Sequence, residues 1–162
     1  MRRVNIASPR FSYDGEDAEG FRAGTFRLGP DLGAARLGSA RLGATVYELA
    51  PGQAVCPYHY EYGEEEWLLV LEGRPTVRHP EGQDELASSD VVRFGVGPEG
   101  AHGVRNETEE TVRVLMFSNS STRPSRSTPT ATRSASAPRA SATTWWSGAR
   151  ARSTTTTASA SA

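Results

Sequence analysis

The sequence predicts an all-β protein built around one small barrel. Short runs of apolar and β-branched residues recur along the first 117 residues, and Gly, Pro, Asn and Asp separate them. No stretch shows the 3.6-residue apolar period of an amphipathic helix. At 162 residues the chain suits a single domain. Many short strands with turns at such spacing are typical of a sandwich or a barrel.

The expected elements follow one another with short connections. A polar N-terminal arm, residues 1–20, precedes the barrel domain, residues 21–118. Within the domain, apolar runs bounded by turn residues predict strands at 23–28, 44–49, 67–71, 75–79, 90–94 and 111–117. Residues 29–31 and 81–84 are predicted turns because they combine Gly with Asp. We expect Leu68, Val70 and Val104 to face the interior of the barrel.

The last segment, residues 119–162, differs in kind from the domain. From residue 120 onward it contains only Ser, Thr, Ala, Pro, Arg, Trp and Gly, including six arginines and no acidic residue. This composition predicts a disordered, low-complexity tail. A basic arm for nucleic acid is the alternative, but the arginines form no dense cluster.

A frameshift near Asn119 is a third interpretation of the tail. Every residue type in it has a codon with C or G at the second base, and the chain contains Arg but no Lys, which indicates a GC-rich gene. A shift of one base would move C- or G-rich third positions into second positions. We favour this hypothesis, and reading the gene in its other two frames tests it.

The compartment and the partners are predicted from simple features. A single cysteine, Cys56, excludes an internal disulfide and suits a reducing compartment. No apolar run approaches the length of a membrane span, and the N-terminus lacks the apolar stretch of a signal peptide. Together with a net charge of −1, these features predict a cytoplasmic protein without membrane or nucleic-acid partners.

Two short segments carry the candidate metal ligands, which are His59, Glu61, Glu66 and His102. His59 and Glu61 lie two residues apart, so they share a face if the chain is extended there. Imidazole and carboxylate are the ligand types of Zn, Fe(II) and Mn(II). A lone His-x-Glu is most simply a solvated loop. The second segment, residues 97–106, strengthens the metal hypothesis because a rigid turn there delivers another histidine to a strand.

Other polar and aromatic residues receive structural interpretations. Cys56 is expected to be a small core residue near the site, and His79 an exposed turn residue. Trp67 is expected to pack on the outer face, and Arg93 and Arg113 to form outward salt bridges.

Together the two segments resemble the motifs of the cupin superfamily. The first motif (Gly, five residues, His-x-His, three or four residues, Glu, six residues, Gly) is matched by Gly52, His59-Tyr60-Glu61, Glu66 and Gly73. The second (Pro-x-Gly, two residues, His, three residues, Asn) is matched by Pro98-Glu99-Gly100, His102 and Asn106. Glu61 stands where the family has its second histidine. The first spacing is one residue longer than usual and the second is one shorter.

The resemblance implies a cupin-type, jelly-roll-like β-barrel that holds one divalent metal, Zn, Fe(II) or Mn(II). It also implies a small-molecule ligand and a homodimer. Two functions stay open: an enzyme of the dioxygenase or isomerase type acting on a small oxygenated substrate, and a non-catalytic module that binds or senses a sugar-like or carboxylate ligand. The sequence assigns no catalytic residue.

Overall fold

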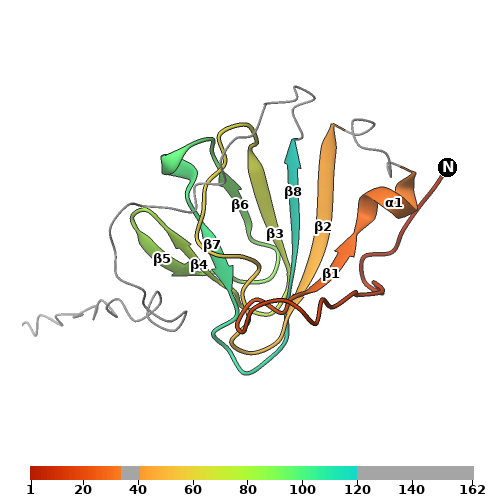
Figure 1. Cartoon of the computed structure of the whole chain (residues 1–162), viewed down its shortest axis with the longest axis horizontal. Coiled ribbons are helices and arrows are strands. Elements are labelled where there is room, and N and C mark those ends of the chain that lie inside the picture. The colour runs from red at the N-terminus through yellow and green to blue at the C-terminus, as the bar shows by residue number, and fades with distance from the viewer. Residues whose placement is uncertain (34–40, 120–162) are drawn as a thin grey trace, which may run out of the picture.

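The computed structural model describes residues 1–33 and 41–119 of the chain, which form two antiparallel sheets (Figure 1). The five-stranded sheet has the order β1 (Gly24–Arg27), β2 (Leu42–Leu49), β8 (Val112–Asn119), β3 (Glu66–Glu72), β6 (Val91–Phe94). The three-stranded sheet has the order β5 (Gly82–Glu85), β4 (Thr76–His79), β7 (Gly103–Arg105). The predicted all-β class is confirmed, although the two sheets do not join into a closed ring within the described ranges. The predicted tail and the frameshift hypothesis concern residues 120–162, which lie outside the described residues.

The core lies where the inward side chains of the two sheets meet. Leu68 and Val70 alternate along β3 and are at most 1% exposed, as is Val104 on β7, so the three predicted inward positions are confirmed. Burying a side chain of this size contributes about 1.5–3 kcal/mol to stability. The remaining core residues come from both sheets and include Leu49, Val77, Phe94, Val112, Val114 and Met116.

The segment before β3 extends the smaller sheet. Residue Ala54 forms an isolated bridge with Arg105, and the Val55 amide donates to the carbonyl of Val104 at 3.0 Å. Further along, His59 forms a second isolated bridge with His102. The backbone of residues 54–59 therefore runs beside β7, which brings two distant parts of the sequence together.

Two predicted turns are wrong in detail. Residues 29–31 lie inside a one-turn helix, α1 (Leu28–Leu32), which ends at Gly33 with φ 87°. Residues 82–84 belong to the edge strand β5, and the turn itself falls at residues 80–81. The β5 segment carries no apolar residue, and its pairing with β4 rests on backbone hydrogen bonds that an apolar pattern does not reveal.

The N-terminal segment contacts the edge of the larger sheet. Ser12 bridges Thr25 of β1, and the amide of Ala54 donates to the carbonyl of Gly20 at 2.8 Å.

In the part of the chain that the structure describes, no helix is both long enough and apolar enough to cross a membrane.

Candidate metal centre

Three separate segments bring together His59, Glu66 and His102. Glu66 is the first residue of β3, while the two histidines face each other across the bridge beside β7. The His59 amide donates to the His102 carbonyl at 3.0 Å, and the His102 amide donates to the His59 carbonyl at 2.8 Å. The imidazole centroids lie 4.7 Å apart. Since paired backbones hold both histidines, their side chains start from fixed positions.

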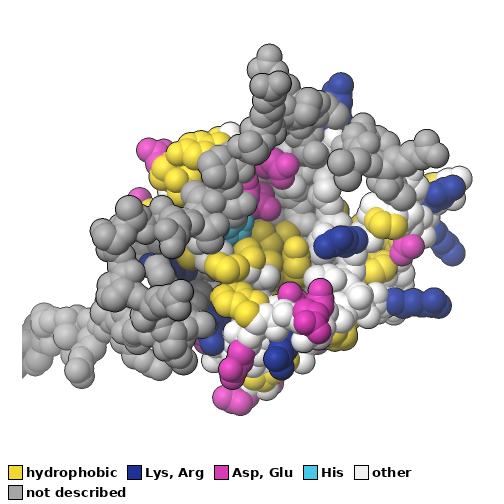
Figure 2. Space-filling model, in the orientation of Figure 1, with side chains coloured by type: hydrophobic (Ala, Val, Ile, Leu, Met, Phe, Trp, Pro, Cys, Tyr) yellow, Lys and Arg dark blue, Asp and Glu magenta, His cyan; other side chains and the backbone are white. Residues whose placement is uncertain are grey.

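The donor atoms of these three side chains converge. Nε2 of His102 lies 3.3 Å from Oε2 of Glu66, and Nε2 of His59 lies 3.7 Å from the same oxygen. All three lie within 4.8 Å of one another, and no other set of at least three His, Cys, Asp or Glu side chains in residues 1–33 and 41–119 converges in this way. Figure 2 shows histidine surface at a hollow between acidic and apolar side chains.

The other nitrogen of each histidine is fixed by a backbone carbonyl. Nδ1 of His59 lies 3.0 Å from the carbonyl oxygen of Pro57, and Nδ1 of His102 lies 2.9 Å from that of Gly100. Because a carbonyl only accepts, each Nδ1 carries the hydrogen and donates it. The neutral imidazole then presents a lone pair on Nε2, which is the arrangement that metal-bound histidines commonly show.

The polar atoms at the centre of the cluster are buried, and some of them lack hydrogen bonds. Oε2 of Glu66 and Nε2 of His102 are shielded from solvent and have no hydrogen-bond partner, since their contact has the distance of an ion pair without hydrogen-bond geometry. Buried polar atoms of this kind are rare and call for an explanation. Two imidazole nitrogens and a carboxylate suit Zn, Fe(II) or Mn(II), so these residues fit the metal that the fold family implies.

The three side chains by themselves form a charged cluster. The contact with His102, followed by the one with His59, lowers the pKa of Glu66 to about 2 even though burial opposes the shift. The hydrogen bond with Cys56, then the contact with Glu66, raises the pKa of His59 to about 10. A metal ion at this place must displace a proton from His59, because only neutral imidazole is a ligand.

Neighbouring side chains that the sequence did not single out shape the site. Phe94 lies directly opposite Glu66 in the pairing of β6 with β3, and its ring stacks on His102 with centroids 3.7 Å apart and planes 7° apart. Tyr47 is half-buried, and burial, aided by the charges of Cys56 and Glu66, raises the pKa of its phenol. Only the strand register, which the sequence does not contain, could have placed Phe94 at the site.

Of the other residues named in the sequence analysis, Cys56 lies near the site as expected, whereas Glu61 lies apart from the converging donors. Sγ of Cys56 lies 3.4 Å from Nδ1 of His59, so the cysteine touches the site. Glu61 does not join the converging group. The pairing beside β7 ends at His59, and the carbonyl of Glu61 accepts a hydrogen bond from the Gly97 amide at 2.7 Å. The chain bends only after Glu61, at residues 62–63, so sharing a face with His59 was not enough to bring the carboxylate of Glu61 to the other donors.

The second motif acts through its backbone and its buried amide. A Cβ atom at Gly100 would lie 1.7 Å from the carbonyl oxygen of Gly95, so only glycine lets the turn before His102 close. Asn106 is fully buried, and its side-chain amide donates to the carbonyls of Leu49 and Glu110, at 2.9 and 2.6 Å. This asparagine holds the loop after β7 and does not point to a ligand role.

Comparison with solved structures gives several similar folds. A protein of Acidithiobacillus ferrooxidans named a sugar phosphate isomerase is 27% identical, with a TM-score of 0.56, and the match covers 62% of this chain and 61% of that chain. A protein of Silicibacter pomeroyi named a sugar phosphate isomerase from a cupin superfamily is 19% identical, with a TM-score of 0.60 and coverage of 74% and 76%. The polyketide cyclase RemF of Streptomyces resistomycificus is 21% identical, with a TM-score of 0.57 and coverage of 74% and 79%.

Comparison with known protein families and curated proteins complements the comparison of folds. No curated protein matches it. The family model described as "Cupin domain" matches residues 45–118, which run from β2 to β8 and include all three converging side chains. This match and the similar folds agree with the two motifs in the sequence. Residues 45–118 therefore belong to the cupin superfamily.

Proposed function

We propose that the protein binds one divalent metal ion, Zn, Fe(II) or Mn(II), through Nε2 of His59, Nε2 of His102 and the carboxylate of Glu66. The observation that carries this proposal is the convergence of two tautomer-fixed histidines on a buried carboxylate oxygen. We further propose that the protein is an enzyme of the isomerase type acting on a small oxygenated substrate. Support comes from the named activity of the 27% identical structure, of whose length the match covers 61%.

Each residue of the site would have a separate role in such an enzyme. A bound ion supplies Lewis-acid polarisation of a carbonyl or enolate oxygen. The carbonyls of Pro57 and Gly100 orient the two imidazoles, and the Phe94 ring covers one side of His102 and keeps water from it. Three protein ligands leave positions for the substrate, as catalytic metal sites require.

We propose Glu61 as a group that moves a proton, in preference to its initial assignment as a fourth ligand. It follows His59 by two residues and is half-buried, but its carboxylate is outside the converging group. A carboxylate beside a metal site can act as a general base. The Glu61→Gln variant should then keep its metal and lose turnover.

The assembly and the location belong to the proposal as well. We propose a cytoplasmic homodimer without nucleic-acid partners. The outer face of the larger sheet supports a second copy as partner, because it carries the stacked pair Trp67 and Phe117 and the 55% exposed Val91. Light scattering at micromolar concentration tests this, and a monomer would contradict it.

Activity assays on metal-loaded protein test the enzyme proposal. The chain is stripped with chelator, reloaded separately with Zn, Fe(II) or Mn(II), and assayed for aldose–ketose interconversion and for oxygen uptake. We expect interconversion without oxygen uptake, and its loss in the Glu66→Gln variant. Oxygen uptake with Fe(II) alone would establish the dioxygenase type instead. Ligand binding without turnover for any metal would establish the non-catalytic binding module.

A further inference from the structure

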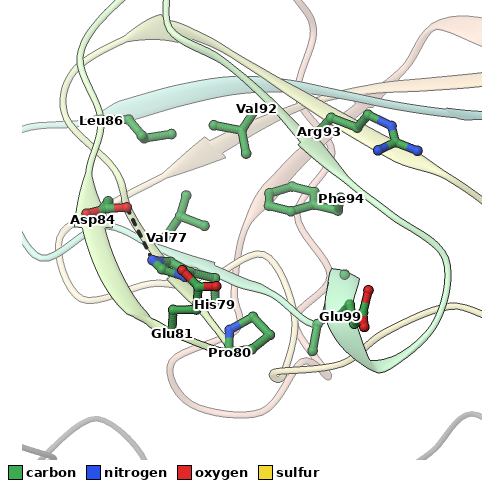
Figure 3. Close-up of a pocket in the computed structure, with 12 residues that line it drawn as sticks. Val77, His79, Pro80, Glu81, Asp84, Leu86, Val92, Arg93, Phe94 and Glu99 are labelled. Carbon is green, nitrogen blue, oxygen red and sulfur yellow. Dashed lines mark ion pairs between the residues drawn. The ribbon is translucent and has the colours of Figure 1, made fainter.

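A second histidine–carboxylate contact lines a cavity that the metal centre does not use. The cavity measures about 680 Å³ and lies between β6, the β4–β5 hairpin and the turn at Pro98–Gly100 (Figure 3). Small-molecule sites typically enclose about 300–1,000 Å³. None of His59, Glu66 and His102 lines it, whereas Phe94, which stacks on His102, does. The cavity is therefore a neighbour of the metal centre with its own walls.

One wall of the cavity is apolar. Val77 and Phe94 are buried core residues of β4 and β6, and Leu86 and Val92 are half-buried beside them. In Figure 3 the side chains of Leu86, Val92 and Val77 point toward one another and form this wall. Such a wall favours a molecule with at least one apolar face.

The opposite wall carries hydrogen-bond acceptors. Nε2 of His79 lies 3.2 Å from Oδ2 of Asp84 in the neighbouring strand, and the dashed line of Figure 3 marks this pair. His79 is thus not the exposed turn residue expected from the sequence, since it ends β4 and only 28% of its side chain is exposed. Glu81 and Glu99 also line the cavity. This contact has the distance of an ion pair, and the buried Nε2 has no hydrogen-bond partner, so the imidazole can also serve a ligand.

The charges of this wall select against anions. Glu81, Asp84 and Glu99 place three carboxylates around the cavity. Among the described residues of its lining, the one guanidinium is that of Arg93, which is already paired with Glu65. A phosphate or carboxylate group on a ligand would meet like charge, whereas hydroxyl groups would donate hydrogen bonds to the carboxylates.

We propose that the cavity between β6 and the β4–β5 hairpin binds a neutral polyhydroxylated small molecule, a sugar or cyclic polyol without a phosphate group. Its apolar ring face packs on the Phe94 wall, and its hydroxyls donate to Asp84, Glu81 and Glu99. The His79–Asp84 pair positions the ligand. The site rests on the cavity alone and does not depend on a metal.

Saturation-transfer NMR and calorimetry on the full chain test the proposal. The probes are neutral hexoses, pentoses and inositols, each measured beside its own phosphate monoester at low ionic strength. We expect at least one neutral probe to bind and its phosphate ester to bind about tenfold or more weakly, since each unscreened like charge opposes binding. If none of the neutral probes binds, or if the esters bind more tightly, the proposal is overturned.

Variants connect the binding to this wall. Asp84→Asn should weaken the binding of the neutral probe by about tenfold, which is the usual loss of affinity when a hydrogen bond to a charged group is removed. Glu85→Gln is the matched control, because Glu85 is the next residue of β5 and pairs with Arg74 at 3.3 Å; it should bind as the wild type does. The double change Glu81→Lys and Glu99→Lys should reverse the preference toward the phosphate ester, and an unchanged preference would overturn the charge argument.

The Glu66→Gln variant separates this site from the metal centre. We expect it to bind the neutral probe with unchanged affinity, in the presence or absence of chelator. Loss of binding in this variant would show that the ligand is held at the metal centre, and would overturn the independent site. Failure of metal binding by the wild type, with sugar binding retained, would leave this inference standing and remove the proposed function.

Discussion

Two histidine–carboxylate clusters lie in this fold, and they differ in how they are held. At the metal centre, Glu66 meets two histidines from other segments, and His102 is only 2% exposed. On the β4–β5 hairpin, His79 meets a single carboxylate, Asp84, whose side chain is 74% exposed. Both clusters leave a buried histidine nitrogen without a hydrogen bond, but only the first also buries its carboxylate oxygen, whereas the second faces an open cavity.

The surroundings of each cluster determine what its histidine–carboxylate contact can bind. Backbone carbonyls fix the tautomers of His59 and His102, so their lone pairs point to one place. Among the described residues, no two further His, Cys, Asp or Glu side chains converge with His79 on one point. The convergence of donors therefore favours a metal at the first cluster, and the single contact at the second suits hydrogen bonding to a ligand.

Removing a ligand should give the largest effect. The variants Glu66→Gln and His102→Ala should lose metal affinity by more than about 1,000-fold, since loss of a residue that merely orients a ligand already costs about 10–100-fold. His79→Gln should retain metal as the wild type does. Metal content after gel filtration measures both. Equal metal loss in His79→Gln would abolish the distinction between the clusters.

Truncating Phe94, which lies between the two clusters, should have the second largest effect. Phe94 is 5% exposed and stacks on His102, so Phe94→Ala should lower the free energy of unfolding by about 3 kcal/mol, at the lower end for buried Phe. Phe117→Ala, on the outer face against Trp67, should cost about 1 kcal/mol because its site is only half-buried. Urea unfolding compares the two, and a smaller cost at Phe94 would contradict the account.

The pH dependence of the metal-free protein should follow Glu66. Its pKa in the folded chain is about 2 against an ordinary 4.5. A lowered pKa gives stability that is complete above pH 4.5 and is lost as the pH falls toward 2. In chelator, the stability difference between wild type and Glu66→Gln should shrink by roughly 2 kcal/mol over this window. A difference independent of pH would show that Glu66 is not paired with the histidines.

The hairpin pair should contribute least to stability. Asp84 is mostly exposed, so Asp84→Asn should change the free energy of unfolding by less than about 1 kcal/mol. The same variant should still weaken the binding of the neutral probe. A loss of several kcal/mol would mean that the pair is part of the structural core.

The fold could be predicted from the sequence because the core strands display their pattern. The inward residues Leu68 and Val70 alternate with outward ones, and Val104 follows a glycine-rich turn. The strand β5 shows no such pattern, since Gly82–Glu85 is polar throughout and exposed. Its place depends on the tight turn at residues 80–81 and on backbone pairing with β4.

The candidate site could be predicted in part. The residue types and spacings of the two motifs pointed to His59, Glu66 and His102, which the structure brings together. The place of Glu61 could not be predicted, because the pairing ends two residues earlier. Phe94 and the His79–Asp84 contact depend on which strands are neighbours, and a single sequence does not record this.

Anomalous diffraction from crystals grown with Mn(II) or Zn tests the central claim most directly. We predict one anomalous peak bonded to Nε2 of His59, Nε2 of His102 and an oxygen of Glu66, at about 2.0–2.2 Å from each. The claim is contradicted if no peak lies at these atoms at saturating metal, or if the only peak lies at His79 and Asp84.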